Sequence, residues 1–172
     1  MVSLDKEDFK SWKIKKGHHY CSNLLRMSLY LKQIRLSYDV IFQDSCAYTM
    51  AYPHNLDINK LFGLSYGYHH HNSIRFGWHS NNGIQIFAYY YVDGIRKEEW
   101  MCTLKTGVQY KMTIIRQSDK YSLVITGPDN LLKQKIVNHG LNMVNYGYEL
   151  FPYFGGTQKC PQDMIILMHK NE

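Results

Sequence analysis

Two short turn signals constrain this sequence more than any other feature. Asn82-Gly83 and Asp93-Gly94 are residue pairs that two-residue hairpin turns prefer, and each stands between stretches of alternating, aromatic-rich residues. The region is therefore predicted to form antiparallel strands joined by tight turns. Their expected ranges are 61–69, 73–79, 84–92 and 95–104.

The side chains of these strands should sort onto two faces, because successive residues of a strand point to opposite sides of its sheet. One face gathers rings and polar groups, namely His69, His71, Arg75, His79, Gln85, Tyr89 and Tyr91. A row of this kind is typical of a surface that binds a ligand. Phe76, Trp78 and Trp100 are expected to pack in the core.

Most of the remaining sequence also alternates like short strands. They are predicted at 20–30, 34–42, 108–116, 121–125, 148–154 and 164–169. A short helical turn is expected within 3–12, and 129–145 fits either a short helix or a strand with its loop. Roughly ten strands with almost no helix predict an all-β sandwich or barrel. Closing so many strands into one barrel would leave a large cavity, so the expected fold is an antiparallel two-sheet jelly roll.

Length and composition exclude several classes of protein. The 172 residues are expected to form one domain, with 1–12 as a short N-terminal extension. The net charge of +6 comes from scattered basic residues, which does not predict nucleic-acid binding. The cysteines lack the spacing of a zinc site, so we expect free, mostly buried thiols, no metal and no cofactor: Cys21, Cys46, Cys102 and Cys160.

The start of the sequence and the length of its apolar runs bear on where the protein is located. The N-terminus is polar and acidic, unlike a signal peptide, and no apolar run is long enough for a membrane span. We therefore expect no membrane partner and a cytoplasmic protein, or a secreted one if a leader has been removed.

Three stretches resemble the concanavalin A-like lectin and glucanase group of β-sandwiches. They are Lys60 to Gly67, His70 to Trp78, and the ending Leu150-Phe151-Pro152-Tyr153-Phe154-Gly155-Gly156. The ending, with Pro161-Gln162-Asp163 and the apolar run Met164–Met168, is similar to an uncharacterised bacterial jelly-roll family. The resemblance spans about residues 12–169. It implies a two-sheet jelly roll and a function linked to sugars.

The glucanases of this group carry carboxylates on one strand face in a Glu-x-Asp-x-x-Glu pattern, which this sequence lacks. Glu98 and Glu99 are adjacent and would point to opposite faces. Hydrolysis by paired carboxylates is therefore not expected. Galectins bind sugar with a His-x-Asn-x-Arg strand, and here Arg75 falls one position too late to share a face with His70 and Asn72.

Alginate-type lyases of the same architecture use a His/Tyr pair with Arg and Gln. This sequence supplies the residue types in His71, Arg75, Gln85, Tyr89 and Tyr91. The Gln-Ile-His signature of such lyases is absent, because Phe87 stands where the histidine would be.

Three functions stay open at this point. The leading hypothesis is non-catalytic binding of a carbohydrate or another polar ligand on the concave sheet face, through His71, Arg75, His79, Gln85, Tyr89 and Tyr91. The first alternative is lyase-like β-elimination, with His71 or His79 acting beside Tyr89 or Tyr91 and an arginine. The second is a protein-interaction or structural module. An oligosaccharide or polysaccharide is the expected partner, and a homodimer is left open.

Overall fold

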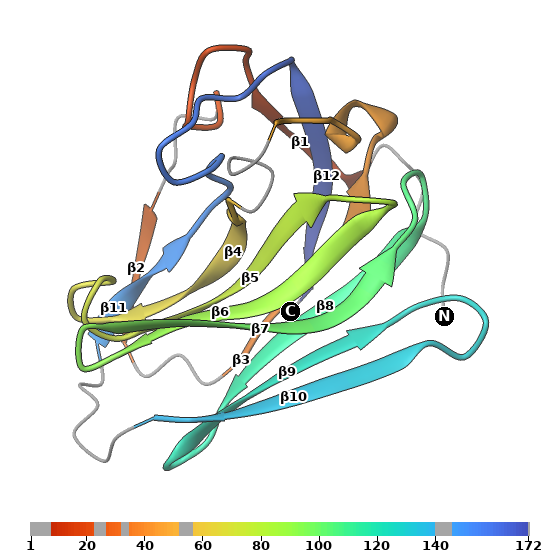
Figure 1. Ribbon diagram of the computed structural model, residues 1–172. Helices are drawn as coiled ribbons and strands as arrows, with labels where there is room; N and C mark the ends of the chain where they lie inside the picture. Colours follow the sequence, from red (N-terminus) through yellow and green to blue (C-terminus); the bar gives the residue numbers. More distant parts are fainter. Residues whose placement is uncertain (1–7, 23–26, 32–34, 52–56, 140–145, 172) are drawn as a thin grey trace.

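Two six-stranded antiparallel sheets pack face to face (Figure 1). The computed structural model describes residues 8–22, 27–31, 35–51, 57–139 and 146–171. Sheet A has the strand order β1 (Lys10–Ile14), β12 (Met164–Asn171), β3 (Arg35–Phe42), β8 (Gln109–Arg116), β9 (Lys120–Thr126) and β10 (Leu132–Asn138). Sheet B has the order β2 (Met27–Leu31), β11 (Tyr146–Leu150), β4 (Asn59–Tyr66), β5 (Ser73–Ser80), β6 (Ile84–Val92) and β7 (Ile95–Leu104). The expected antiparallel jelly-roll sandwich is confirmed.

The hairpins turn at the predicted positions, with two residues between the paired Val92 and Ile95 but three between the paired Ser80 and Ile84. Asn82 and Asp93 adopt positive φ values of 49° and 50°, and Gly83 and Gly94 follow with φ of 111° and 79°. Two successive positive φ angles are what a type I′ turn requires. Consequently β5, β6 and β7 are neighbours in both sequence and sheet B.

The hydrophobic core lies between the two sheets. Ile74, Phe76 and Trp78 project from β5 into it and have no exposed surface. Across the interface, the rings of Phe42 and Trp78 lie 5.2 Å apart. The four cysteines are free and buried, as expected. Because the even-numbered residues of β5 face the core, the odd-numbered residues of β5 and of its partner β6 point away from sheet A. We call this side the outer face of sheet B.

Two β-bulges interrupt the alternation and change which side chains reach that face. On β4, Lys60 pairs with Gly77 but Gly63 pairs with Arg75, so one extra residue separates them. On β7, Cys102 pairs with Ile86 but Trp100 pairs with Phe87, which leaves Met101 as the extra residue. A bulge of this kind reverses the faces beyond it.

The prediction that Trp100 packs in the core is therefore wrong. Strict alternation groups it with the buried Cys102 and Leu104, but the bulge at Met101 turns it outward, and 58% of its surface is exposed. Phe76 and Trp78 are buried as predicted.

Several element boundaries also differ from the predictions. Lys10–Ile14 forms β1 instead of continuing a helical turn, while 1–7 lie outside the described residues. For 129–145 the sequence fitted either a short helix or a strand, and in the described part of this range Leu132–Asn138 forms a strand. The predicted strand at 61–69 ends at Tyr66, and the predicted strand at 148–154 ends at Leu150.

No helix in the described ranges is long and apolar enough to cross a membrane. That the chain forms a single domain stays a prediction.

Candidate functional site

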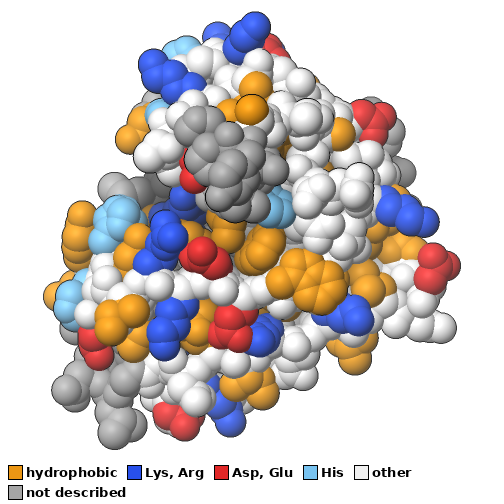
Figure 2. All heavy atoms as spheres, in the orientation of Figure 1, with side chains coloured by type: hydrophobic (Ala, Val, Ile, Leu, Met, Phe, Trp, Pro, Cys, Tyr) orange, Lys and Arg blue, Asp and Glu red, His pale blue; other side chains and the backbone are white. Residues whose placement is uncertain are grey.

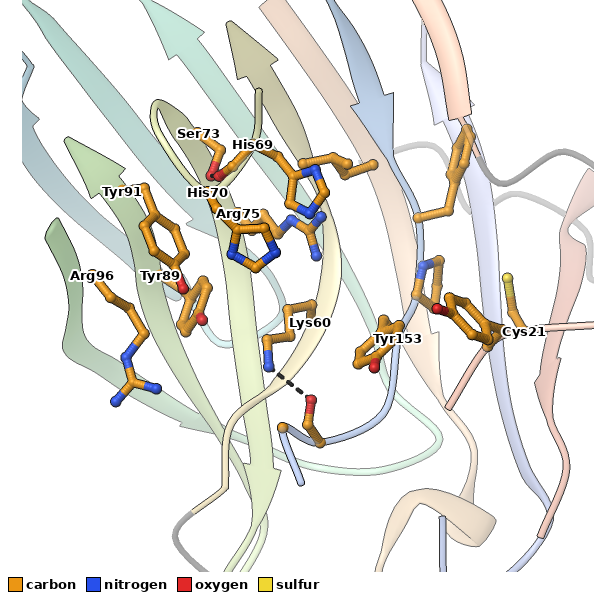
Figure 3. A pocket seen from close by; sticks show the side chains of 16 residues that line it. Cys21, Lys60, His69, His70, Ser73, Arg75, Tyr89, Tyr91, Arg96 and Tyr153 are labelled. Carbon is orange, nitrogen blue, oxygen red and sulfur yellow. Dashed lines mark hydrogen bonds between the residues drawn. The ribbon is translucent and has the colours of Figure 1, made fainter. Parts of the chain in front are cut away.

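A cavity of about 550 Å³ opens on the outer face of sheet B, where β4 to β7 meet the segment that follows β11 (Figure 3). We call it the sheet-B pocket. Its lining combines cations, imidazoles and phenols with a glycine-rich rim. The polar lining residues are Tyr20, Lys60, His69, His70, Ser73, Arg75, Tyr89, Tyr91, Arg96 and Tyr153. Cys21, Leu150, Phe151, Pro152, Gly155 and Gly156 complete it.

Arg75 lies at the floor of the pocket and is only 9% exposed. It is flanked by Tyr89 on β6 and by Gly63 on β4. Gly63 makes room for it, because a Cβ at that position would lie 2.5 Å from Arg75 Cγ and 2.2 Å from the Ile74 carbonyl oxygen. Burial lowers the pKa of the Arg75 guanidinium to about 10.

No carboxylate in the described part of the chain forms an ion pair with Arg75. A buried cation without an anionic partner costs free energy that a bound anion would recover. Arg75 is therefore prepared to bind an anionic ligand, and its planar fork suits a carboxylate.

Lys60 enters the pocket because of the bulge on β4. Its Nζ donates a hydrogen bond of 2.7 Å to the Gly155 carbonyl oxygen. It also lies 5.1 Å from the centre of the Tyr89 ring and 5.7 Å from that of Tyr153. Burial, reinforced by the charge of Arg75, lowers the pKa of the Lys60 ammonium to about 8. A lysine with such a pKa offers a neutral amine at mildly alkaline pH.

Tyr89 and Tyr91 stand side by side on β6, with ring centres 6.0 Å apart. Burial raises the pKa of the Tyr89 phenol far above its usual range, and hydrogen bonding with Tyr91 adds to the effect. Tyr89 therefore keeps its proton at any physiological pH and can only give it to a group that becomes strongly basic during a reaction.

The histidines of the pocket come from the turn between β4 and β5. Tyr148 OH lies 2.7 Å from His69 Nδ1, and Ser73 Oγ donates a 2.6 Å hydrogen bond to the His69 carbonyl oxygen. The His70 ring packs edge-on against Tyr91, with centres 5.3 Å apart. Burial lowers the pKa of His69 to about 4, so its imidazole is neutral at pH 7. His69 therefore adds no charge to those of Lys60, Arg75 and Arg96 at that pH.

The charge of the lining has one sign. Lys60, Arg75 and Arg96 line the pocket, and none of its described lining residues is Asp or Glu. Two carboxylates lie at the rim: Asp57 accepts hydrogen bonds of 3.4 and 3.3 Å from the Gly156 and Thr157 amides, and Glu98 forms an ion pair of 3.3 Å with Arg96 Nε. The site is thus built for an anion flanked by aromatic rings.

The structure brings three of the six sequence-predicted site residues into the pocket, namely Arg75, Tyr89 and Tyr91. The other three lie elsewhere. His71 is exposed in the turn and hydrogen-bonds to the Asn72 amide, and His79 packs on Phe87 with ring centres 5.0 Å apart. Gln85 accepts hydrogen bonds from Trp100 Nε1 and Thr103 Oγ1.

Sequence reasoning missed Lys60, Arg96 and Tyr153. The bulge hid Lys60, since it shares its parity with the buried Phe62 and Leu64. Tyr153 lies beyond the end of β11, outside any predicted alternation with β4, and an isolated bridge joins it to Lys60. Arg96 pairs with Tyr91 across β6 and β7, so extending the face analysis to β7 would have found it.

Among the described residues, no three His, Cys, Asp or Glu side chains gather closely enough to hold a metal ion. The pocket therefore has to be understood from its amine, guanidinium, imidazole and phenol groups. The absence of a cofactor stays a prediction.

Comparison with solved structures agrees on the fold. An alginate lyase from a Chlorella virus superposes with a TM-score of 0.62 at 14% identity, covering 94% of this chain and 82% of that one. An alginate lyase from Klebsiella pneumoniae gives 0.60 at 9% identity, covering 80% of this chain and 58% of the other. A GH43 protein from Bacillus licheniformis gives 0.59 at 7% identity, and this chain spans 32% of its length.

No family model and no curated protein matches the sequence. At these identities the structural matches establish the architecture, a concanavalin A-like jelly-roll β-sandwich, which confirms the resemblance noted from the sequence.

Proposed function

We propose that this protein binds an acidic, uronate-containing polysaccharide in the sheet-B pocket and cleaves it by β-elimination. The observation that carries the proposal is the buried guanidinium of Arg75, which has no ion-pair partner in the described part of the chain, beside an amine of lowered pKa and a phenol of raised pKa. Structural similarity to two alginate lyases supports the same substrate class.

The three groups match the three needs of the reaction. Arg75 binds the uronate carboxylate and stabilises the negative charge that builds up next to it. Neutral Lys60 Nζ removes the proton from C5, the carbon that bears the carboxylate. The electron pair forms a C4=C5 double bond while the C4–O4 bond breaks, and Tyr89 gives its proton to the departing O4.

This assignment changes the base considered from the sequence. His71 is exposed outside the pocket and His79 lies toward the far end of β5, so neither is near Arg75 and Tyr89 in the manner that the reaction needs. Lys60 takes the role because its Nζ is held over the Tyr89 ring.

The test is to incubate the protein with alginate and with polygalacturonate and to follow the ultraviolet absorbance of the unsaturated product. We expect a rate that rises with pH through about 8, as the neutral form of Lys60 becomes populated. Lys60→Met and Tyr89→Phe should each lower the rate by about 100-fold or more. The exposed Lys105→Met serves as the matched control and should leave it unchanged.

Arg75→Met separates binding from cleavage. It should fold, because it removes a buried unpaired charge, and it should lose affinity for the polysaccharide. Binding that requires Arg75 without any unsaturated product would favour the non-catalytic alternative. No binding of either polysaccharide would contradict both.

A further inference from the structure

We infer that the outer face of sheet B continues beyond the pocket as an aromatic platform, formed by Trp100 and Phe87, that stacks against a further sugar of the same polysaccharide chain. The inference rests on the proposed function and extends it from one acidic sugar to a chain of several. It names residues that no step of the proposed reaction uses.

The platform lies directly beside the pocket on sheet B. Phe87 and Tyr89 are two residues apart on β6, so both point to the outer face, about 7 Å from each other along the strand. Trp100 pairs with Phe87 across β6 and β7, while Glu98, the next outward residue of β7, pairs with Tyr89. The platform is therefore the next row of the sheet after the row that holds Arg75 and Tyr89.

Trp100 is the exposed member of the three tryptophans. Trp100 is 58% exposed, whereas Trp12 and Trp78 are 3% and 0% exposed. In the space-filling view, hydrophobic side chains lie open to solvent among charged ones over β6 and β7 (Figure 2). A ligand that covers the exposed indole removes apolar surface from water, and an aromatic face suits the apolar face of a sugar ring.

Hydrogen bonds hold the indole of Trp100 in place. Trp100 Nε1 donates a 2.8 Å hydrogen bond to Gln85 Oε1, which also accepts one of 3.0 Å from Thr103 Oγ1. Gln85 Nε2 in turn donates to the Asn81 carbonyl oxygen at 2.8 Å. This network fixes the plane of the indole before any ligand arrives, which reduces the entropy lost on binding.

The surface between the pocket and the platform carries an ion pair. Glu98 stands between Tyr89 and Trp100 on this path, but its carboxylate is paired with Arg96 at 3.3 Å. An acidic chain leaving the pocket therefore passes an ion pair and not an uncompensated anion. The occupant that suits this continuity is the next part of the polysaccharide held at Arg75.

Tryptophan fluorescence provides a direct test, because Trp100 is the only one of the three tryptophans with substantial exposure. The wild-type protein is titrated with an alginate disaccharide and hexasaccharide at 4 °C and pH 6, well below the pKa of Lys60, so that the amine is protonated and cleavage is slow. Acrylamide quenching of the fluorescence is measured with each ligand. The hexasaccharide should protect the indole from quenching, and the disaccharide should not.

Affinities give the second measurement. Trp100→Ala should weaken hexasaccharide binding by about five- to tenfold and leave disaccharide binding within about twofold. Leu132→Ala, which truncates a 64% exposed side chain on β10 of the other sheet, should change neither.

The outcomes separate the two proposals. Hexasaccharide binding that depends on Arg75 but neither protects Trp100 nor weakens in Trp100→Ala would overturn the platform and leave the proposed function standing. If neither oligosaccharide binds the wild-type protein, both proposals are overturned.

Discussion

Replacing Lys60 with methionine should change how the stability of the fold depends on pH. The pKa of Lys60 falls from its ordinary 10.5 to about 8 in the folded protein. Between these values the unfolded chain binds the proton more readily than the folded chain does. The free energy of unfolding must therefore rise with pH through this window, and below about pH 8 the full cost of burying the charge is present.

The magnitude follows from the two pKa values. Relative to an uncharged residue, Lys60 destabilises the fold by about 3 kcal/mol at pH 7 and by about 1 kcal/mol at pH 9.5. Methionine also removes the hydrogen bond to the Gly155 carbonyl oxygen, at a cost of about 1–3 kcal/mol that does not depend on pH. The two effects oppose each other at pH 7, but only the first one changes with pH.

Urea unfolding of the wild type and of Lys60→Met at both pH values provides the assay. From pH 7 to 9.5 the wild type should gain about 2 kcal/mol relative to the variant. Lys105→Met, at an exposed lysine, should track the wild type and so corrects for titration elsewhere. A difference between wild type and Lys60→Met that stays constant within about 0.5 kcal/mol would refute the lowered pKa and, with it, the amine as base.

Two further predictions concern packing. Gly63→Ala places a Cβ 2.2 Å from the Ile74 carbonyl oxygen, so it should destabilise the fold by about 1–3 kcal/mol, whereas Gly156→Ala, with no atom closer than 3.7 Å, should cost far less; equal urea midpoints would contradict this. Leu64→Ala, at a fully buried site, should lower the free energy of unfolding by about 2–5 kcal/mol, and Leu132→Ala, 64% exposed, by less than about 0.5 kcal/mol. Similar losses in these two leucine variants would show that the inner face of β4 is misassigned.

The fold was predictable where the controlling chemistry is local. Asn-Gly and Asp-Gly set the turns of two hairpins, and alternation then placed Arg75, Tyr89 and Tyr91 on one face, where they line the pocket. These inferences need only neighbouring residues, which is why they succeed.

The rest of the site depends on pairing between strands, which alternation cannot reveal. Lys60 and Trp100 each sit next to a bulge, so alternation gave no sign of Lys60 in the pocket, and Trp100 was wrongly predicted to lie in the core. Alternation also grouped His71 with Arg75, but β4 ends at Tyr66 and the three consecutive histidines lie in a turn, with His71 outside the pocket. A bulge or strand end is fixed by the partner strand, so the single sequence carries little sign of it.

The bulges have a consequence for how such a protein could diversify. If β4 paired with β5 in one continuous register, without the bulge between Lys60 and Gly63, Lys60 would lie opposite Trp78 and its amine would turn toward the hydrophobic interior. Without the bulge at Met101, Trp100 would likewise lie opposite the buried Ala88, and its indole would turn inward. A one-residue shift of register at either position is thus enough to bring each of these groups to the surface or to bury it while the sandwich persists, so relatives with the same architecture need not share its chemistry.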